Sequence, residues 1–331
     1  MVASPSGSPL LVALYGPTAS GKTRLSVELA HRIRRTLGLE PVVVSADSRQ
    51  VYRYMDIGTA KATPEEMRGI PHELIDVAEP VRKLELEEYV PLARAVVDQA
   101  LRDGRVPMIV GGTGVYVGAL LEGWHVDRTG ATRQSLRSDF PRAMAADAYR
   151  TLRRLDRGAA ARVHPNNYEG IINALAAAMS GASAARGEAA PGVRRVVLGL
   201  DPGQRALDDL IARRLAAQLE AGLFDEVCSL AARYDLDRAA RRERPDPNQV
   251  LQTIGYREFF ERVVARGRRV ADLDRADLDA VGREVIEHTR AHARRQRAWF
   301  RKLPGVRMIG SARQAASLVA AGDTNRRGPH G

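Results

Sequence analysis

The sequence contains a single cysteine, Cys228, among 331 residues. One cysteine excludes a disulfide framework and a cysteine-rich zinc site, and the amphipathic pattern of residues 223–232 predicts a packed thiol. Long apolar runs are also absent, since the stretch 10–15 is far too short to cross a bilayer. Residues 1–9 lack the basic region of a secretory signal. From these absences we expect a cytoplasmic protein that has no membrane segment.

Acidic residues are fewer than basic ones. The chain has 40 Asp and Glu and 51 Lys and Arg, which gives a net charge of +11. A basic excess of this size favours a polyanionic partner such as nucleic acid. An arginine-rich surface that is merely solvated explains the charge equally well. The hydrophobic fraction of 44% and the chain length are ordinary for a globular enzyme with one large domain or two modest ones.

Short apolar runs alternate with helical patterns in the first third of the chain. Strands are predicted at 10–15, 41–46 and 107–110, and helices at 23–37 and 89–103. This alternation predicts an α/β fold with a mostly parallel sheet. In such sheets, ligands bind at the carboxyl ends of the strands.

The pattern changes after residue 123, where alanine-rich and arginine-rich helical stretches replace strands until a strand pattern returns at 195–200. We therefore predict an α/β core with a helical insertion. The predicted divisions are 10–123 for the first part of the core, 124–190 for the insertion, 191–310 for the remainder of the core with a basic C-terminal helix, and 1–9 and 322–331 for flexible tails.

Residues 16–23 fit the phosphate-binding pattern G-x-x-x-x-G-K-[ST], between a predicted strand and a predicted helix. The glycines let backbone N–H groups converge on phosphate oxygens, and the helix N-terminus adds its positive dipole end. Lys22 supplies a positive charge, and the Thr23 hydroxyl is a ligand for Mg²⁺. The motif predicts a di- or triphosphate site formed by Gly16, Thr18, Ala19, Ser20, Gly21, Lys22 and Thr23.

Polar residues also follow the second and third predicted strands. Asp47 comes after the second strand, where a carboxylate serves as a general base, a metal ligand or a helix N-cap. The third strand ends in the glycine-rich turn 111–114, which allows a ligand to approach the backbone closely. Thr113 within this turn is a candidate for hydrogen bonding to a reacting group.

Taken together, these segments resemble the tRNA dimethylallyltransferases, also called tRNA isopentenyltransferases. The resemblance covers residues 10–310 and is carried by GPTASGKT at 16–23, SADSRQVYR at 45–53, DIGTAK at 56–61, PHELID at 71–76, VGGTGVYV at 110–117, RVHPNN at 162–167, GLFDEV at 222–227, IGYRE at 254–258 and TRAHARRQRAWFRKLPGV at 289–306. DIGTAK combined with the phosphate-binding loop and the GGTG turn is specific, because kinases do not carry that set.

The resemblance implies a P-loop NTPase-like fold, a monomer, and transfer of a prenyl group from dimethylallyl diphosphate to N6 of adenine 37 in the tRNA anticodon loop. The family's general base falls on Asp47, its threonine at the reacting centre on Thr113, and its cationic clamp on Lys22 and Arg214. These roles suit the chemistry, because N6 is a poor nucleophile that needs a base and a leaving diphosphate needs cations and Mg²⁺.

The resemblance also implies contacts with RNA. Ser48, Arg49 and Gln50 match the family segment that contacts the substrate RNA. A basic helix near the end of the chain offers a face for RNA phosphates, formed by Arg290, Arg294, Arg295, Arg297, Arg301 and Lys302. A solvated charged helix is the alternative interpretation of that segment.

Four positions depart from the family pattern. Gly170 and Asn173 occupy positions where arginines are expected, Ala176 replaces a glutamate, and Tyr54 replaces a glycine. Because the arginines belong to the part of the pattern that faces RNA, a small-molecule acceptor such as an adenine nucleotide or another amine is an alternative to tRNA. A P-loop kinase is a further alternative, which Asp47, DIGTAK and GGTG together disfavour. A non-catalytic RNA-binding protein is another, and it would not need Lys22, Asp47 and Thr113 all present.

Overall fold

The predicted strands form the centre of a parallel sheet in the computed structural model, which describes residues 8–121, 136–137, 139–179, 192–242, 246–301 and 305–321. Within these residues the strand order is β3-β2-β4-β1-β5-β6, and every neighbouring pair is parallel. The strands are β1 (Leu10–Tyr15), β2 (Pro41–Ser45), β3 (His72–Glu73), β4 (Val106–Gly111), β5 (Arg194–Gly199) and β6 (Arg307–Met308). The α/β prediction is therefore confirmed, and β4 lies between β2 and β1.

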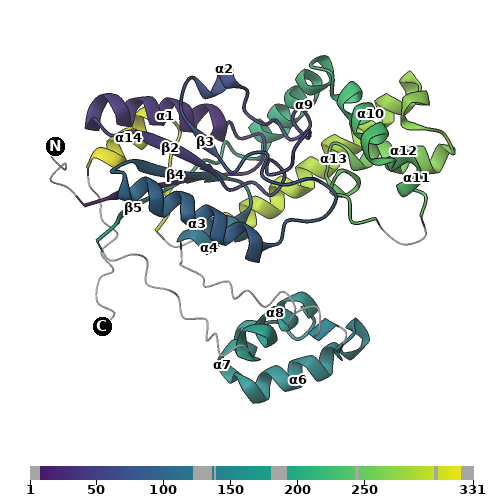
Figure 1. Cartoon of the computed structure of the whole chain (residues 1–331), viewed down its shortest axis with the longest axis horizontal. Helices are drawn as coiled ribbons and strands as arrows, with labels where there is room; N and C mark the ends of the chain where they lie inside the picture. Colours follow the sequence, from purple (N-terminus) through teal and green to yellow (C-terminus); the bar gives the residue numbers. More distant parts are fainter. Residues whose placement is uncertain are drawn as a thin grey trace. The chain divides into compact units, whose positions relative to one another are not determined.

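Helices lie between successive strands of the chain, and a further helix follows the last strand (Figure 1). Those that precede β5 are α1 (Lys22–Leu37), α2 (Pro64–Met67), α3 (Leu86–Arg102), α4 (Gly114–Leu121), α6 (Ala145–Leu155), α7 (Arg157–Arg162) and α8 (Tyr168–Met179). Those that follow it are α9 (Gln204–Glu220), α10 (Leu223–Tyr234), α11 (Leu236–Ala239), α12 (Arg257–Arg266), α13 (Arg275–Phe300) and α14 (Ala312–Ala320). Three 3₁₀ turns lie at Arg142–Met144, Val250–Gln252 and Val270–Asp272.

The chain divides into two compact units, one of residues 1–85, 92–117 and 192–331, the other of residues 86–91 and 118–191. In the first unit, α1 and α14 pack together on one side of the sheet (Figure 1). Their apolar faces meet the alternating side chains of the strands in a buried cluster that includes Val12, Leu29 and Val319. Burial of this apolar surface is the main force that holds the helices on the sheet.

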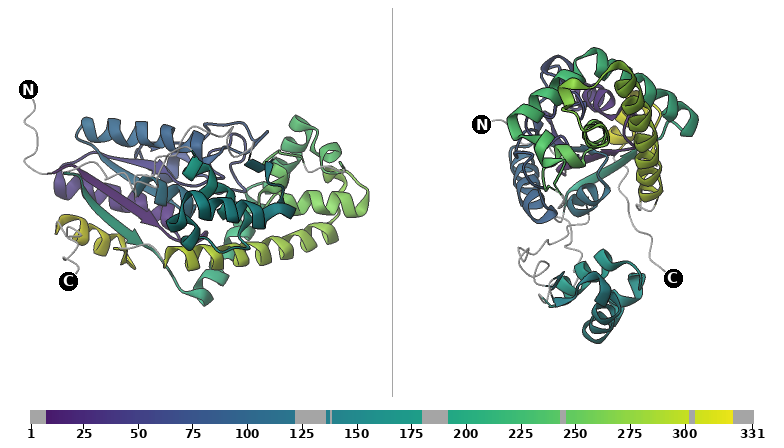
Figure 2. Two further views of the ribbon diagram at one scale, coloured as in Figure 1. Left: turned by 90° about the horizontal axis from the view of Figure 1, so that it is seen from below. Right: turned by 90° about the vertical axis from the view of Figure 1, so that its right-hand side faces the viewer.

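The longest helix of the first unit, α13, runs from the region of α12 to the carboxyl end of the sheet (Figures 1 and 2). It starts at Asp274, whose side chain caps the helix by accepting a hydrogen bond from the Asp277 N–H. Near its other end, Phe300 stacks on Tyr15 at the end of β1, with the ring centroids 4.5 Å apart. This contact brings the end of α13 next to the segment that follows β1.

The described part of the second unit is helical. Helices α6, α7 and α8 pack around a separate apolar cluster that includes Leu152, Ile171 and Leu175. The predicted helical insertion at 124–190 overlaps this unit, and the predicted tails lie mostly outside the described residues. Among the described helices, none is long and apolar enough to cross a membrane.

Candidate active site

The loop between β1 and α1 has the geometry of a phosphate-binding loop. Gly21 stands at the N-cap of α1 with a φ of 85°, a conformation that favours glycine. A Cβ atom at Gly16 would lie 2.3 Å from the carbonyl oxygen of Leu200, so this position excludes any side chain. No side chain caps α1, and no acidic residue stands in its first turn. The N–H groups and positive dipole end of α1 are therefore available to an anion.

Two cations converge beside this loop. The Lys22 ammonium donates a hydrogen bond to the carbonyl oxygen of Pro17 at 2.7 Å, and the Arg214 guanidinium of α9 donates to the Thr18 hydroxyl at 3.2 Å. Burial lowers the pKa of Lys22 to about 8, although the Asp47 carboxylate acts against this shift and Arg214 adds to it. Burial also lowers the pKa of Arg214. Two desolvated cations that face each other favour an anion between them.

A cavity of about 150 Å³ joins the residues predicted from separate motifs. Its lining includes Thr18, Gly21, Lys22, Thr23, Asp47, Gln50, Thr59, Gly111 and Arg214. The other predicted residues of the phosphate-binding loop, Gly16, Ala19 and Ser20, do not line it. The same is true of Ser48 and Arg49, which stand between the lining residues Asp47 and Gln50, and of Thr113, two positions after Gly111. Phosphate-binding groups and a carboxylate thus share one cavity.

Asp47 lies in a turn at the end of β2. Its Oδ1 atom accepts a hydrogen bond from the Arg49 N–H at 2.9 Å, and the segment that follows forms turns rather than a helix. The helix N-cap interpretation of Asp47 is therefore wrong, because no helix begins there. The described residues contain no group of three His, Cys, Asp or Glu side chains that could hold a metal ion, so a carboxylate-rich metal cage has no support there. The general-base and metal-ligand interpretations of Asp47 stay predictions.

The ends of β2 and β4 are joined directly through Thr113. Its hydroxyl oxygen accepts a hydrogen bond from the Ser48 N–H at 2.9 Å and donates one to the Ser48 hydroxyl at 3.2 Å. The Thr113 N–H donates to the carbonyl oxygen of Ala46 at 3.2 Å. A Cβ atom at Gly111 would lie 2.0 Å from that same carbonyl oxygen, which explains the glycine. The GGTG turn therefore holds the backbone on either side of Asp47.

The C-terminal half of α13 contributes two residues of the 289–306 motif that were given no role from the sequence. The Gln296 amide accepts a hydrogen bond from the Thr18 N–H at 2.8 Å and donates one to the carbonyl oxygen of Gly112 at 2.6 Å. One turn earlier in the helix, burial lowers the pKa of His292, and the charge of Asp47 opposes the shift. A neutral imidazole and a carboxamide therefore accompany the cations of this region.

The arginines of α13 differ in their surroundings. Arg297 is 16% exposed, and its guanidinium pairs with the Asp201 carboxylate at 2.9 Å and donates to Gln204 at 2.8 Å. Arg290 is 41% exposed and lies 3.5 Å from the Asp208 carboxylate. Arg294 is exposed. The predicted RNA-facing arginines thus include one that is held inside the protein, and Lys302 lies outside the described residues.

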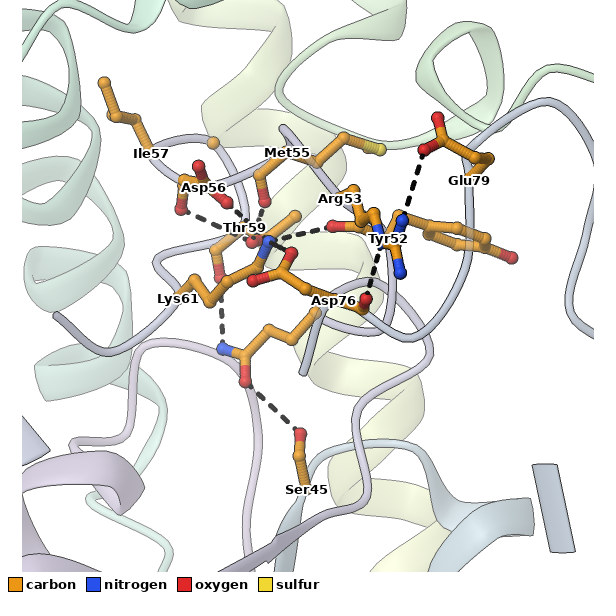
Figure 3. A network of polar contacts seen from close by, with 12 residues as sticks. Ser45, Tyr52, Arg53, Met55, Asp56, Ile57, Thr59, Lys61, Asp76 and Glu79 are labelled. Carbon is orange, nitrogen blue, oxygen red and sulfur yellow. Dashed lines mark hydrogen bonds and ion pairs between the residues drawn. The ribbon is translucent and has the colours of Figure 1, made fainter. Parts of the chain in front are cut away.

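The DIGTAK motif forms a supported loop beside the cavity. The Glu226 carboxylate of α10 accepts hydrogen bonds from three successive N–H groups, those of residues 56–58, at distances of 2.8–3.1 Å. Lys61 is only 6% exposed, and its ammonium contacts the carboxylates of Asp56 and Asp76 and the carbonyl oxygen of Tyr52 (Figure 3). Within the same loop, the carbonyl oxygen of Thr59 accepts a hydrogen bond from Arg214 at 3.0 Å. DIGTAK therefore helps to orient the Arg214 guanidinium.

The departures from the family pattern have local explanations. Tyr54, in place of glycine, adopts a φ of 66°, and its ring lies 3.9 Å from the guanidinium carbon of Arg233. In the second unit, the Gly170 N–H donates to the Asn167 side chain at 3.0 Å. A Cβ atom at Gly170 would lie 2.6 Å from the Asn167 amide nitrogen, so an arginine there would displace this contact. Asn173 is exposed on α8.

Comparisons with known proteins agree with this geometry. The family model described as IPP transferase matches residues 50–303, and the isopentenyl transferase model matches residues 9–84. A tRNA dimethylallyltransferase of Roseiflexus sp. (strain RS-1) is 39% identical and covers 93% of this chain and 97% of its own length. The corresponding protein of Koribacter versatilis (strain Ellin345) is 37% identical, with coverages of 94% and 96%.

Solved structures of tRNA-modifying prenyltransferases are also similar to this chain. The tRNA isopentenylpyrophosphate transferase of Bacillus halodurans superposes with a TM-score of 0.64 at 31% identity and covers 95% of this chain and 96% of its own. A eukaryotic dimethylallyltransferase acting on tRNA gives a TM-score of 0.71 at 23% identity and shares the fold, with coverages of 92% and 74%. The P-loop NTPase-like fold is confirmed by these neighbours.

Proposed function

The chain belongs to the IPP transferase family of tRNA dimethylallyltransferases, and we propose that it transfers a dimethylallyl group from dimethylallyl diphosphate to N6 of adenine 37 in the tRNA anticodon loop. The observation that carries this proposal is the shared cavity, in which Asp47 accompanies Lys22 and Arg214. The reaction requires cations that neutralise the leaving diphosphate and a base that takes up a proton, and these residues supply both.

The donor half of the reaction uses the phosphate-binding loop. As the bond between the allylic carbon and the bridging oxygen breaks, its electron pair passes to the diphosphate. Lys22, Arg214 and the N-terminus of α1 neutralise the growing negative charge in a partly desolvated site, where such interactions are strong. Stabilisation of the leaving group lowers the barrier to transfer.

A Mg²⁺ ion fits this half of the site. Mg²⁺ commonly binds through one or two protein oxygens, several waters and substrate phosphates. The Thr23 hydroxyl lines the cavity at the start of α1 and would supply the protein oxygen. The bound ion supplies further positive charge to the diphosphate, and the requirement for it is tested by chelation followed by titration of Mg²⁺ in the transfer assay.

The acceptor half depends on Asp47 and on the turn that holds it. The N6 lone pair forms the new bond to the allylic carbon, and the N6 proton passes to the Asp47 carboxylate. Thr113 fixes the backbone beside Asp47 through Ser48, which keeps the carboxylate in position. Since adenine N6 is a weak nucleophile, removal of its proton during bond formation is the useful contribution of a base.

The RNA face proposed for this enzyme includes Ser48, Arg49 and Gln50 near the cavity and the exposed side of α13. Arg294 on α13 is exposed, whereas Arg297 is occupied by Asp201. Replacement of Arg294 by alanine should therefore weaken tRNA binding and lower the salt dependence of binding by about one ion. Replacement of the exposed Arg24 on α1, which pairs with Glu28, is the matched control.

A transfer assay tests the proposed function. The protein is incubated with radiolabelled dimethylallyl diphosphate and either unmodified tRNA bearing adenine at position 37 or AMP. Label incorporated into tRNA supports the proposal, and label found only in AMP would replace tRNA with a small-molecule acceptor. Absence of transfer to either acceptor, with consumption of ATP, would overturn the prenyltransferase assignment. The monomeric state and the cytoplasmic location expected from the sequence stay predictions.

A further inference from the structure

One side chain of α13 joins the loop after β1 to the turn after β4 through two hydrogen bonds. The Oε1 atom of Gln296 accepts from the N–H of Thr18, 278 positions away in the chain, and its Nε2 atom donates to the carbonyl oxygen of Gly112, 184 positions away. Thr18 belongs to the loop that follows β1, and Gly112 to the turn that follows β4. The amide orientation is fixed by these partners, because an N–H only donates and a carbonyl oxygen only accepts.

The contacts on either side of Gln296 hold the helix firmly in this place. Ala293 packs in a buried cluster with Leu207 and Ile211, against which Ala19 of the phosphate-binding loop also packs. A Cβ atom at Gly114 would lie 2.4 Å from the ring of Trp299, so the helix and the glycine-rich turn are in close contact. The Arg297–Asp201 pair anchors the same turn of α13. Gln296 therefore reaches its two partners from a fixed backbone.

Each partner of Gln296 is connected to a residue that we propose takes part in the reaction. The Thr18 hydroxyl accepts a hydrogen bond from the Arg214 guanidinium, which we propose binds the diphosphate together with Lys22. Gly112 precedes Thr113, whose hydroxyl holds Ser48 next to Asp47. A displacement of either backbone segment would change the distance between the leaving group and the base. Misplacement of reacting groups by about 1 Å costs on the order of 100-fold in rate.

We propose that Gln296 is a positioning residue that sets the diphosphate loop and the GGTG turn at the separation that prenyl transfer requires. The proposal rests on the proposed function for its activity readout, but the bridge itself is independent of the acceptor. It requires a side chain with a donor and an acceptor on one planar end group. A carboxamide meets this requirement, and so does a protonated carboxylic acid, whereas a carboxylate only accepts.

The pair of variants Gln296→Met and Gln296→Glu tests the bridge. Methionine removes both hydrogen bonds at similar volume, and we expect kcat/KM for tRNA to fall about 10- to 100-fold at every pH. Glutamate is expected to match that loss at pH 8, where its carboxylate repels the Gly112 carbonyl. As the pH is lowered to 5.5, protonation restores the donor, so the ratio of Gln296→Glu to wild-type activity should rise while that of Gln296→Met stays flat.

Other charged groups lie near Gln296 in both proteins. Lys22, Asp47 and Arg214 line the adjoining cavity, His292 and Arg297 lie on α13, and Asp201 follows β5. The variant-to-wild-type ratio removes their contribution, since they are common to both enzymes. Gln99→Glu on α3, at an exposed glutamine, is the matched control and should give a ratio near one at every pH.

Binding of inorganic diphosphate, measured by calorimetry, separates this proposal from the proposed function. If the wild type transfers no prenyl group, the proposed function fails. The Gln296 hydrogen bonds are then still tested by diphosphate binding, because the affinity of Gln296→Glu should recover as the pH is lowered. Equal behaviour of the Glu and Met variants across pH, or full activity of Gln296→Met, would overturn the positioning role. Melting temperatures of all variants identify a loss that comes from unfolding alone.

Discussion

The backbone N–H of Ser48 donates a hydrogen bond to the hydroxyl of Thr113 at 2.9 Å, although the two residues are 65 positions apart in the chain. This bond ties the turn after β2 to the turn after β4. Asp47 immediately precedes Ser48, so the backbone beside Asp47 is held by the turn after β4, while its carboxylate accepts a hydrogen bond from the Arg49 N–H. The catalytic role of Thr113 is therefore expected to include support of the base as well as contact with the reacting centre.

Asp47→Asn should lower prenyl transfer about 100- to 10,000-fold, because asparagine keeps the acceptor for the Arg49 N–H but does not take up the N6 proton. Donor binding should change little. Single-turnover transfer to tRNA and calorimetric binding of diphosphate measure the two effects. The exposed Asp98→Asn on α3 is the control. Activity close to that of the wild type in Asp47→Asn would show that another group removes the proton.

Binding of the donor should take up protons above pH 8. In the free protein burial lowers the pKa of Lys22 to about 8, so the amine is largely neutral at pH 8.5. A bound diphosphate favours the charged form and raises this pKa, so that up to one proton is taken up on binding. At pH 7 the amine is already protonated and little uptake is expected.

Calorimetry in two buffers of different ionisation enthalpy measures this uptake. The apparent binding enthalpy should depend on the buffer at pH 8.5 and much less at pH 7. The Lys22→Met variant should lose the buffer dependence at pH 8.5. Identical enthalpies in both buffers for the wild type would mean that Lys22 keeps its charge in the free protein.

Lys61→Met should lower the free energy of unfolding by about 1–3 kcal/mol, because the ammonium is 6% exposed and joins two carboxylates to the Tyr52 carbonyl. The carboxylates are about half exposed and can turn to solvent, which limits the loss. Lys83→Met is the matched control, since its ion pair with Glu85 is exposed, and should cost no more than about 1 kcal/mol. Urea denaturation compares the two. Equal effects would contradict a buried role for Lys61.

Two glycines in the same unit should respond to alanine in opposite directions. In Gly111→Ala the new methyl would meet the Ala46 carbonyl oxygen at 2.0 Å, and we expect a loss of at least about 2 kcal/mol with loss of activity. In Gly282→Ala the nearest atom outside the helix is 3.9 Å away, and alanine within α13 should add about 0.5–1 kcal/mol. Denaturation midpoints of the two variants measure these changes. A Gly111→Ala enzyme as stable as the wild type would show that β2 and β4 can move apart at little cost in free energy.

The sequence predicted the parts of the fold whose signals are local. The strand before Gly16, the glycine at 21 and the helix after it all lie within one short segment, so their pattern was readable. Strand β3 has two residues and pairs only with Val43 and Val44, which leaves too short a run to show a period. The turn after Asp47 was not distinguishable from a helix start, because its geometry depends on Thr113.

The sequence motifs pointed to Lys22 and Asp47, which the structure places on one cavity, and their chemical roles stay predictions. The candidate site was not predictable where function depends on a distant partner. Nothing in the chain near Gln296 indicates that its amide reaches Thr18, and charge alone does not distinguish Arg294 on the surface from Arg297 beside Asp201. Such distinctions arise only when elements far apart in sequence pack together.

The strand order also sets a length scale for the reaction. Adjacent strands lie about 4.8 Å apart, so the ends of β2 and β1, with β4 between them, are separated by roughly 10 Å. A base at hydrogen-bond distance from its proton and two reacting atoms about 3 Å apart fill much of that span. The sheet therefore sets the spacing between the phosphate-binding loop after β1 and Asp47 after β2, with Gly111 at the end of β4 between them.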